Sequence, residues 1–244
     1  MRVTQTMSRA EDNTSVLLSQ QLLLGVAEEL KLPLLQVARL AEHGQLTGQP
    51  NLAQIRSSAQ TALQLVDNYA LGVRLAQAPR DIDLEAISVS SVLYDTSQEL
   101  DALAKSYGVK LELHIAGRYG PVMANRQALQ AALTSLGAAL IEALPALEAP
   151  QLKLQLATHS SRYGIVAGLY TDTKQLTNDA LKKGRRLQGQ TRQPLMNLTH
   201  TSGAGIFVAD SILKAMNLNL RASRHQGLYG IGTVLQSNNQ LQLV

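Results

Sequence analysis

The chain has 244 residues, of which 45% are hydrophobic, 16% are charged and none is cysteine. That length suits one large domain or two small ones, and the missing cysteines exclude a disulfide-stapled scaffold and any Cys-ligated zinc or iron–sulfur site. The formal net charge is +4, but five cations without an acid fall between Leu181 and Gln193, so the rest of the chain sums to −1.

Two long helices are predicted at the N-terminal end. Apolar residues recur at helical spacing from Val16 to Glu42, with Pro33 expected to bend the helix, and again from Leu52 to Gln77. The Gly/Pro-rich stretch between them predicts an antiparallel hairpin. One hairpin cannot bury its whole apolar stripe, so we expect a homodimer whose two hairpins form a four-helix bundle.

Beyond Ala78-Pro79-Arg80 the pattern mixes helices and strands. Helices are predicted over Ser91–Ser106, Asn125–Leu144 and Ile206–Met216, the second of them amphipathic. Strands are predicted over Lys110–Ile115, Gln151–Ala157, Tyr163–Tyr170, Leu218–Ala222, Gly232–Gln236 and Leu241–Val244. The sequence therefore predicts an α+β protein, with a helical-hairpin domain over 1–79 and an α/β sandwich over 80–244.

Three short segments carry the strongest motifs. They are EELKLPL (Glu28–Leu34), a glycine pair opening a helix (Ser202–Met216), and a Gly-x-Gly-Thr turn (Gly227–Leu235). In this order the chain resembles the transmitter core of sensor histidine kinases, a dimerising hairpin followed by a Bergerat-type ATP-binding sandwich. The resemblance extends from about Leu17 to the C-terminus and implies a two-component signalling protein.

The chain departs from the family at the phosphate-accepting position. The family motif is His-Glu-x-x-x-Pro-Leu; here Glu29 and Pro33 match, but Glu28 replaces the histidine. A carboxylate cannot act as the imidazole nucleophile, so no catalytic residue is expected. Glu28 either imitates a phosphorylated site by its negative charge or is an ordinary solvent-facing glutamate.

The nucleotide site also departs from the family. The resemblance puts Ser135 and Ala139 at the two Asn positions. The methyl group of Ala139 cannot coordinate Mg²⁺, so we expect no bound metal and no cofactor. The alternative is that the chain still binds ATP with Mg²⁺. A remnant of the site is left, whose glycines could equally be turns that the sandwich needs. It consists of Asp172, Gly203, Gly205, Gly230, Gly232 and Thr233.

The basic segment falls where the family has its flexible ATP lid. Its cations can hold phosphates, or they can meet an acidic protein surface or nucleic acid. They are Lys182, Lys183, Arg185, Arg186 and Arg192.

The five histidines show no metal-ligand spacing. His43 falls at the C-terminal end of the first predicted helix, where its side chain interacts favourably with the helix dipole. His114 belongs to the alternating pattern of a predicted strand. His159, His200 and His225 are predicted to lie in loops. We interpret all five as ordinary surface or hydrogen-bonded histidines.

Three functions follow from these patterns. The first is a pseudokinase or adaptor that binds a response regulator or another signalling protein; the second is an active ATP-dependent kinase or phosphotransferase with an unorthodox site. The third, a nucleic-acid regulator using the basic lid, ranks last because only 3% of residues are aromatic. No apolar run reaches the roughly 18–20 residues of a membrane span, so a cytoplasmic location is expected.

Overall fold

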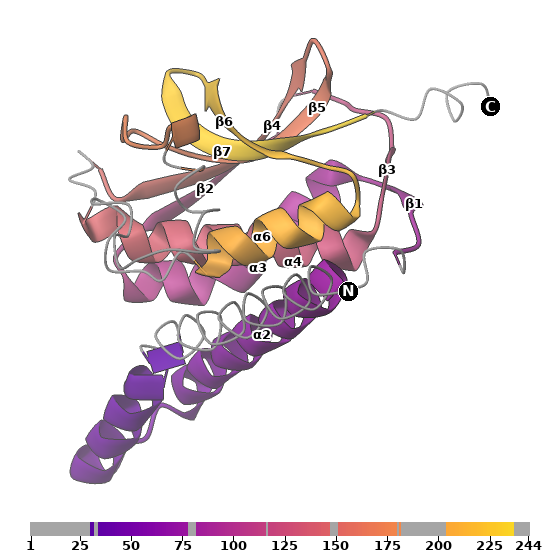
Figure 1. Ribbon diagram of the computed structural model, residues 1–244. Coiled ribbons are helices and arrows are strands. Elements are labelled where there is room, and N and C mark those ends of the chain that lie inside the picture. The colour runs from indigo at the N-terminus through magenta and orange to yellow at the C-terminus, as the bar shows by residue number, and fades with distance from the viewer. Residues whose placement is uncertain are drawn as a thin grey trace, which may run out of the picture.

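The computed structural model describes residues 30–31, 34–77, 82–115, 117–146, 151–179, 181 and 204–236. Within these residues, a helical hairpin lies beneath a layer of helices, and a β-sheet lies above that layer (Figure 1). The predicted α+β class is confirmed. The predicted boundary at 78–80 and the predicted strand at 241–244 lie outside the described residues.

The hairpin has the predicted two arms. The described part of the first arm is helical over residues 34–47, and the second arm is α2 (Leu52–Gln77). The first arm ends at Gly48, whose φ of +68° is a left-handed conformation that glycine adopts without strain. Asn51 then caps α2, because its Oδ1 accepts a hydrogen bond from the backbone N–H of Gln54 at 3.1 Å. The turn between the arms is therefore specified by local chemistry.

The main sheet has five strands in the order β2-β4-β5-β7-β6. The strands are β2 (Lys110–Ile115), β4 (Lys153–Ser161), β5 (Gly164–Thr171), β6 (Leu220–His225) and β7 (Leu228–Leu235). The β2–β4 pair is parallel and the other pairs are antiparallel. A separate pair, β1 (Glu85–Ile87) with β3 (Val122–Ala124), is antiparallel.

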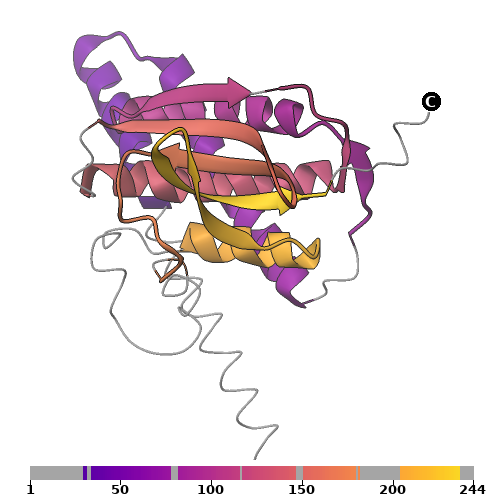
Figure 2. The ribbon, with the colours of Figure 1, turned by 90° about the horizontal axis from the view of Figure 1, so that it is seen from above.

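Three helices cover one face of the sheet (Figure 2). They are α3 (Val89–Ser106), α4 (Arg126–Ala143) and α6 (Ala204–Ala215). Alternate strand residues such as Leu156, Leu169 and Ile231 point into the core that these helices share. The opposite side, which we call the outer face, carries the intervening residues, among them Tyr170.

Several predicted elements need correction. The helix α4 is not amphipathic: fourteen of its eighteen residues are buried, because the sheet, α3, α6 and α2 surround it. The strand β7 begins at Leu228, before the predicted start at Gly232, and β6 continues from Leu220 to His225, past the predicted end at Ala222. The three-residue strands β1 and β3 were not predicted, because three residues are too few to show a period of two.

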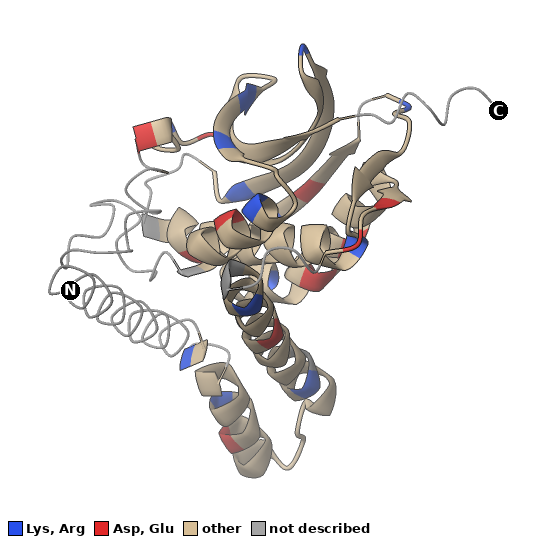
Figure 3. Ribbon diagram, turned by 45° about the vertical axis from the view of Figure 1, so that its right-hand side comes forward, with Lys and Arg blue, Asp and Glu red and all other residues tan. Residues whose placement is uncertain are grey.

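The hairpin and the sandwich share one hydrophobic core. From α2, Leu65, Tyr69 and Leu75 are buried in the same cluster as the sandwich residues. A Cβ at Gly72 would lie 2.9 Å from Cγ1 of Val208, so α2 and α6 are in close backbone-to-side-chain contact. Acidic and basic residues are interspersed along α2 and over the sandwich (Figure 3). Among the described helices, none combines the length and the apolar character required to cross a bilayer.

Candidate functional site

The two positions that should carry the family's asparagines lie inside α4. Ser135 and Ala139 are each 2% exposed. The start of α6 packs directly on them: a Cβ at Gly205 would lie 2.5 Å from the Ser135 carbonyl oxygen and 3.0 Å from the Ala139 Cβ. Gly205 therefore has a packing role, since only a residue without a side chain lets the two helices approach this closely.

Asp172 follows the last residue of β5 and bonds to the backbone. Its Oδ2 accepts a hydrogen bond from the backbone N–H of Gln151 at 3.1 Å, and its Oδ1 accepts one from the Thr171 hydroxyl at 3.4 Å. These contacts connect the end of β5 to the residues just before β4. One carboxylate oxygen thus stabilises the sheet locally, whatever else the residue does.

The glycines of the Gly-x-Gly-Thr motif lie within β7, and the first of them lies under the ring of Tyr170. A Cβ at Gly230 would lie 2.4 Å from Tyr170 Cδ1, and one at Gly168 of β5 would lie 2.6 Å from the Tyr170 hydroxyl oxygen. Gly232 pairs with Gly168, and a Cβ there would lie 2.6 Å from the Ala167 carbonyl oxygen. Gly168 and Gly230 leave room for a tyrosine ring that is fully buried on the outer face, and Gly232 lets β7 lie close to the backbone of β5.

Thr233 points the other way, into the helix-covered core. It is fully buried, and its Oγ1 has no hydrogen-bond partner among the described residues. Its strand neighbours are Ala167 and Leu220, both members of the hydrophobic core. Gly230 and Gly232 on the outer face and Thr233 on the inner face therefore do not converge on a common point.

Several predicted site residues lie outside the described residues. These are Glu28, Glu29, Pro33, Gly203 and the lid cations Lys182, Lys183, Arg185, Arg186 and Arg192. The described residues bring Gly205 together with Ser135 and Ala139, and they place Gly230 and Gly232 together elsewhere.

The prediction that His159 and His225 lie in loops is wrong. His159 lies in β4 and His225 is the last residue of β6. Both join His114 of β2 on the outer face: His225 Nε2 is 3.1 Å from His114 Nδ1, and the His159 and His225 rings stack with centroids 4.5 Å apart. His200 lies outside the described residues.

Two open pockets lie where α3 meets the hairpin. The smaller, of about 230 Å³, contains the carboxylate of Glu99, which accepts hydrogen bonds from Gln130 at 2.5 Å and from the Thr134 hydroxyl at 2.7 Å. The larger, of about 520 Å³, includes Arg39 and Lys105 in its lining. Neither pocket was predictable from the sequence, because each is lined by helices that are far apart in the chain. Within the described residues, no group of three or more His, Cys, Asp or Glu is placed to hold a metal ion.

No family model and no curated protein matches the chain. Solved structures do match. The Acinetobacter baumannii histidine kinase AdeS is 14% identical, with a TM-score of 0.49 over 86% of this chain and 98% of that one. A bacterial phosphotransferase is 9% identical, with a TM-score of 0.47 over 91% and 95% of the two chains.

The full-length structure of ShkA in complex with AMPPNP is 11% identical, with a TM-score of 0.53. It is matched by 92% of this chain, which spans 46% of the ShkA chain. The chain has the fold of a histidine-kinase transmitter core, so the resemblance predicted from its motifs is confirmed at the level of fold.

Proposed function

We propose that this chain is a histidine-kinase-like two-component signalling protein that acts as a pseudokinase or adaptor, without transferring phosphate to itself. The proposal combines two features of the sequence. Glu28 stands where the family has its phosphate-accepting histidine, and Ala139 stands where the family has a magnesium-binding asparagine. We infer that the chain keeps the scaffold for protein contacts and has lost the chemistry.

The observation that carries the proposal is the contact between Gly205 and α4. A hard cation such as Mg²⁺ needs several oxygen ligands at about 2.1 Å. Ala139 offers a buried methyl group, and the backbone of Gly205 packs against it and against Ser135. Direct packing of α6 on α4 at these positions favours two helices in contact over two helices separated by a phosphate-binding site.

The surroundings of the other remnant residues support the same conclusion. Asp172 already accepts a hydrogen bond from the Gln151 backbone, Gly230 accommodates the Tyr170 ring, and Gly232 packs against the backbone of β5. Asp172, Gly205, Gly230 and Gly232 therefore each have a structural reason to be retained. Nucleotide binding is not required to explain them.

The exposed apolar side chains of the hairpin support a homodimer. Leu34 and Leu35 on the first arm are 56% and 45% exposed, and Leu63 and Val66 on α2 are 65% and 40% exposed. A second copy would bury such side chains in a four-helix bundle. We propose that the dimer binds a response regulator or another signalling protein, with the basic lid facing an acidic surface on that partner.

The deciding experiment is incubation of the full chain with labelled ATP and Mg²⁺, beside an active histidine kinase as the positive control. We expect no phosphoprotein, and we expect no thermal shift at millimolar ATP. A shift would be easy to detect, because a ligand at about 100 times its Kd stabilises the protein by about 2.7 kcal/mol. Robust labelling of the chain would overturn the proposal in favour of an active enzyme. A clear shift without labelling would contradict only the expected loss of nucleotide binding.

A further inference from the structure

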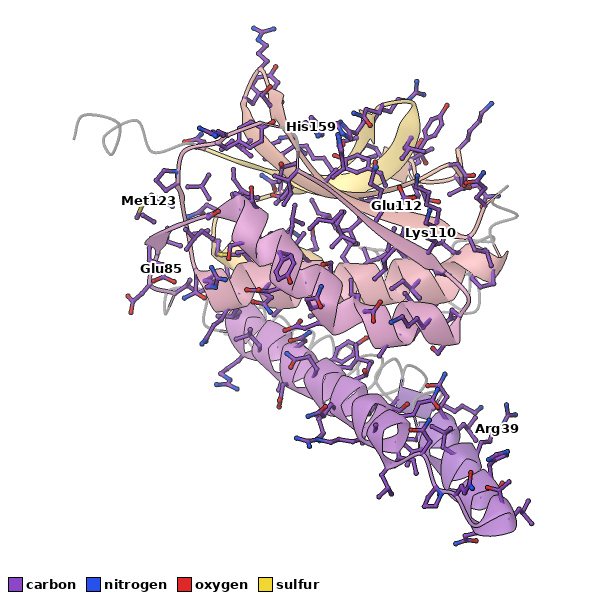
Figure 4. All side chains as sticks on the ribbon, turned by 180° about the vertical axis from the view of Figure 1, so that it is seen from behind. Arg39, Glu85, Lys110, Glu112, Met123 and His159 are labelled. Atoms are coloured by element: carbon purple, nitrogen blue, oxygen red, sulfur yellow. The ribbon has the colours of Figure 1, made fainter. Side chains whose placement is uncertain are left out.

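The outer face of the sheet is covered by a layer of rings from four strands. His114, His159, Tyr170 and His225 lie together: the centroid of the His225 ring is 5.2 Å from that of His114, 4.5 Å from that of His159 and 5.4 Å from that of Tyr170. Figure 4 shows His159 on the side of the sheet away from the helices. We call these four residues the ring layer.

The hairpin formed by β6 and β7 supplies the cover of this layer. β2 and β6 are opposite edges of the sheet, yet His225 Nε2 lies 3.1 Å from His114 Nδ1, so the end of the hairpin crosses back over the outer face (Figure 2). The turn that reverses it uses Gln226 and Gly227 at φ of 50° and 82°. The Tyr170 hydroxyl adds a hydrogen bond to Ser223 of β6 at 2.8 Å.

The ring layer is built for neutral imidazoles. The Nδ1 of His159 is buried and has no hydrogen-bond partner among the described residues, and the same is true of the Gln155 Oε1. A proton added to the His159 Nδ1 would give a positively charged ring whose buried N–H has no acceptor, within stacking distance of His225. Imidazolium rings stacked at this distance would repel each other.

The charged groups around the layer do not offset such a charge. On β2, Glu112 is already paired with Lys153 at 2.5 Å and with Lys110 at 3.1 Å (Figure 4). On β6, Arg221 is a cation on the same face as His225, and Arg224 stacks on Tyr229 of β7, 4.5 Å from the ring centroid. No ion pair recorded within the described part of the chain reaches His114, His159 or His225.

We propose that His159 and His225, packed against His114, form a proton-operated latch, in which the neutral imidazoles of these two residues hold the end of the β6–β7 hairpin over the outer face and their protonation releases it. Release would expose Tyr170 and the glycines beneath it. The latch is independent of nucleotide binding and goes beyond the proposed signalling function. It would make one face of the sandwich responsive to pH.

The direction of the pH dependence follows from burial and from the charges between rings. Burial, and then the neighbouring His225, lower the pKa of His159 below its usual 6.5. Burial, and then His114, lower the pKa of His225. The open hairpin binds protons more readily than the closed one. Closure is therefore fully favoured above pH 6.5 and is lost as the pH falls through the lowered pKa values. Burial raises the pKa of Tyr170 to about 12, so the phenol stays neutral throughout.

Amide hydrogen exchange of the full chain tests the latch. Protection factors, corrected for the intrinsic pH dependence of exchange, are measured between about pH 7.5 and about pH 5, on either side of the usual histidine pKa. We expect protection along β6 and the start of β7 to fall about tenfold for each unit by which a pKa is lowered, while α4 keeps its protection. Protection factors of β6 and the start of β7 that stay unchanged over that pH range would overturn the proposal.

Two variants separate the latch from general acid sensitivity. His225→Phe keeps a ring stacked on His159 but cannot be protonated, so protection of the β6–β7 hairpin should lose the part of its pH dependence that His225 contributes, while His159 keeps its own part. His43→Gln changes an exposed histidine near the turn of the N-terminal helical hairpin, away from the sheet. Its β6–β7 hairpin should show the same pH dependence as the wild type. If His225→Phe fails to fold, NMR titration of the wild-type imidazoles replaces it. Values at or above 6.5 for both His159 and His225, or equal pH dependence in His225→Phe and wild type, would contradict the latch.

Discussion

Gly205 of α6 lies directly against Ala139 of α4, so that a Cβ added to the glycine would lie 3.0 Å from the alanine Cβ. Its nearest atom would be the carbonyl oxygen of Ser135, at 2.5 Å. The contact couples the motif glycine to the position where the family has a metal ligand. A residue expected to meet a phosphate instead meets another helix.

The first prediction concerns Gly205→Ala. In an exposed helix this change stabilises a protein by up to about 1 kcal/mol, but here the new methyl group meets backbone. We expect the free energy of unfolding to fall by roughly 1–3 kcal/mol, the usual cost of overpacking. Urea denaturation followed by circular dichroism measures it, and Gln98→Ala on the exposed side of α3 serves as the control, within about 0.5 kcal/mol of wild type. A gain in stability for Gly205→Ala would show that the two helices do not touch.

The second prediction is a coupling between Gly168 and Tyr170. The three atoms that a Cβ at Gly168 would approach most closely all belong to Tyr170. Gly168→Ala should therefore destabilise the wild type by roughly 1–3 kcal/mol and the Tyr170→Ala variant by far less. A double-mutant cycle should give a coupling above about 1 kcal/mol. Equal costs in the two backgrounds would mean that the ring does not lie over this glycine.

The third prediction concerns the role of Asp172. Asp172→Ala removes the acceptor of the Gln151 backbone N–H and should cost about 1 kcal/mol, whereas Asp172→Asn keeps an acceptor oxygen and should cost less. Thermal unfolding is measured with and without ATP and Mg²⁺. We expect each variant to show the same change in both conditions. A loss that appears only with ATP would identify Asp172 as a nucleotide ligand.

The fourth prediction concerns the dimer. Leu63→Glu places a charge on a side chain that is 65% exposed in the single chain, so it should leave the fold intact while disfavouring burial against a second copy. Size-exclusion chromatography with light scattering should find the variant as a monomer. Gln226→Glu in the exposed β6–β7 turn adds the same charge on the opposite side of the sandwich from the helical hairpin and should remain dimeric. A monomeric wild type would exclude the proposed bundle at the concentration tested.

The periodic part of the fold was predictable from the sequence, and the buried part was less so. The bounds of α2 were predicted correctly because its apolar residues recur at helical spacing among polar ones, so the helical period is visible. The helix α4 is enclosed on all sides and has no such contrast, which made the amphipathic interpretation wrong. Its Ala-rich sequence fits the close approach of α6 at Gly205, a tertiary fact that no local pattern contains.

The site was harder to predict because glycines and histidines have several roles. Gly230 and Gly232 fit a phosphate-binding turn and also fit a strand, and only the positions of the Tyr170 ring over Gly230 and of the β5 backbone beside Gly232 distinguish these interpretations. His114 and His225 are 111 residues apart, at opposite edges of one sheet. Arg221 alternates with Leu220 and Ala222, but the alternation stops before His225, which lies between Arg224 and Gln226, so no local pattern put His225 in a strand. No sequence pattern predicted that the β6–β7 hairpin folds back over the outer face of the sheet.

The contact between Gly72 and Val208 limits how the two parts of the molecule can move. Since Val208 Cγ1 lies only 2.9 Å from where a Cβ at Gly72 would be, turning α2 about its own axis would bring a neighbouring side chain against Val208. Rotation of α2 is thus mechanically linked to displacement of α6. A signal that twists the hairpin would be transmitted to the helix that begins at Ala204, next to the junction with α4.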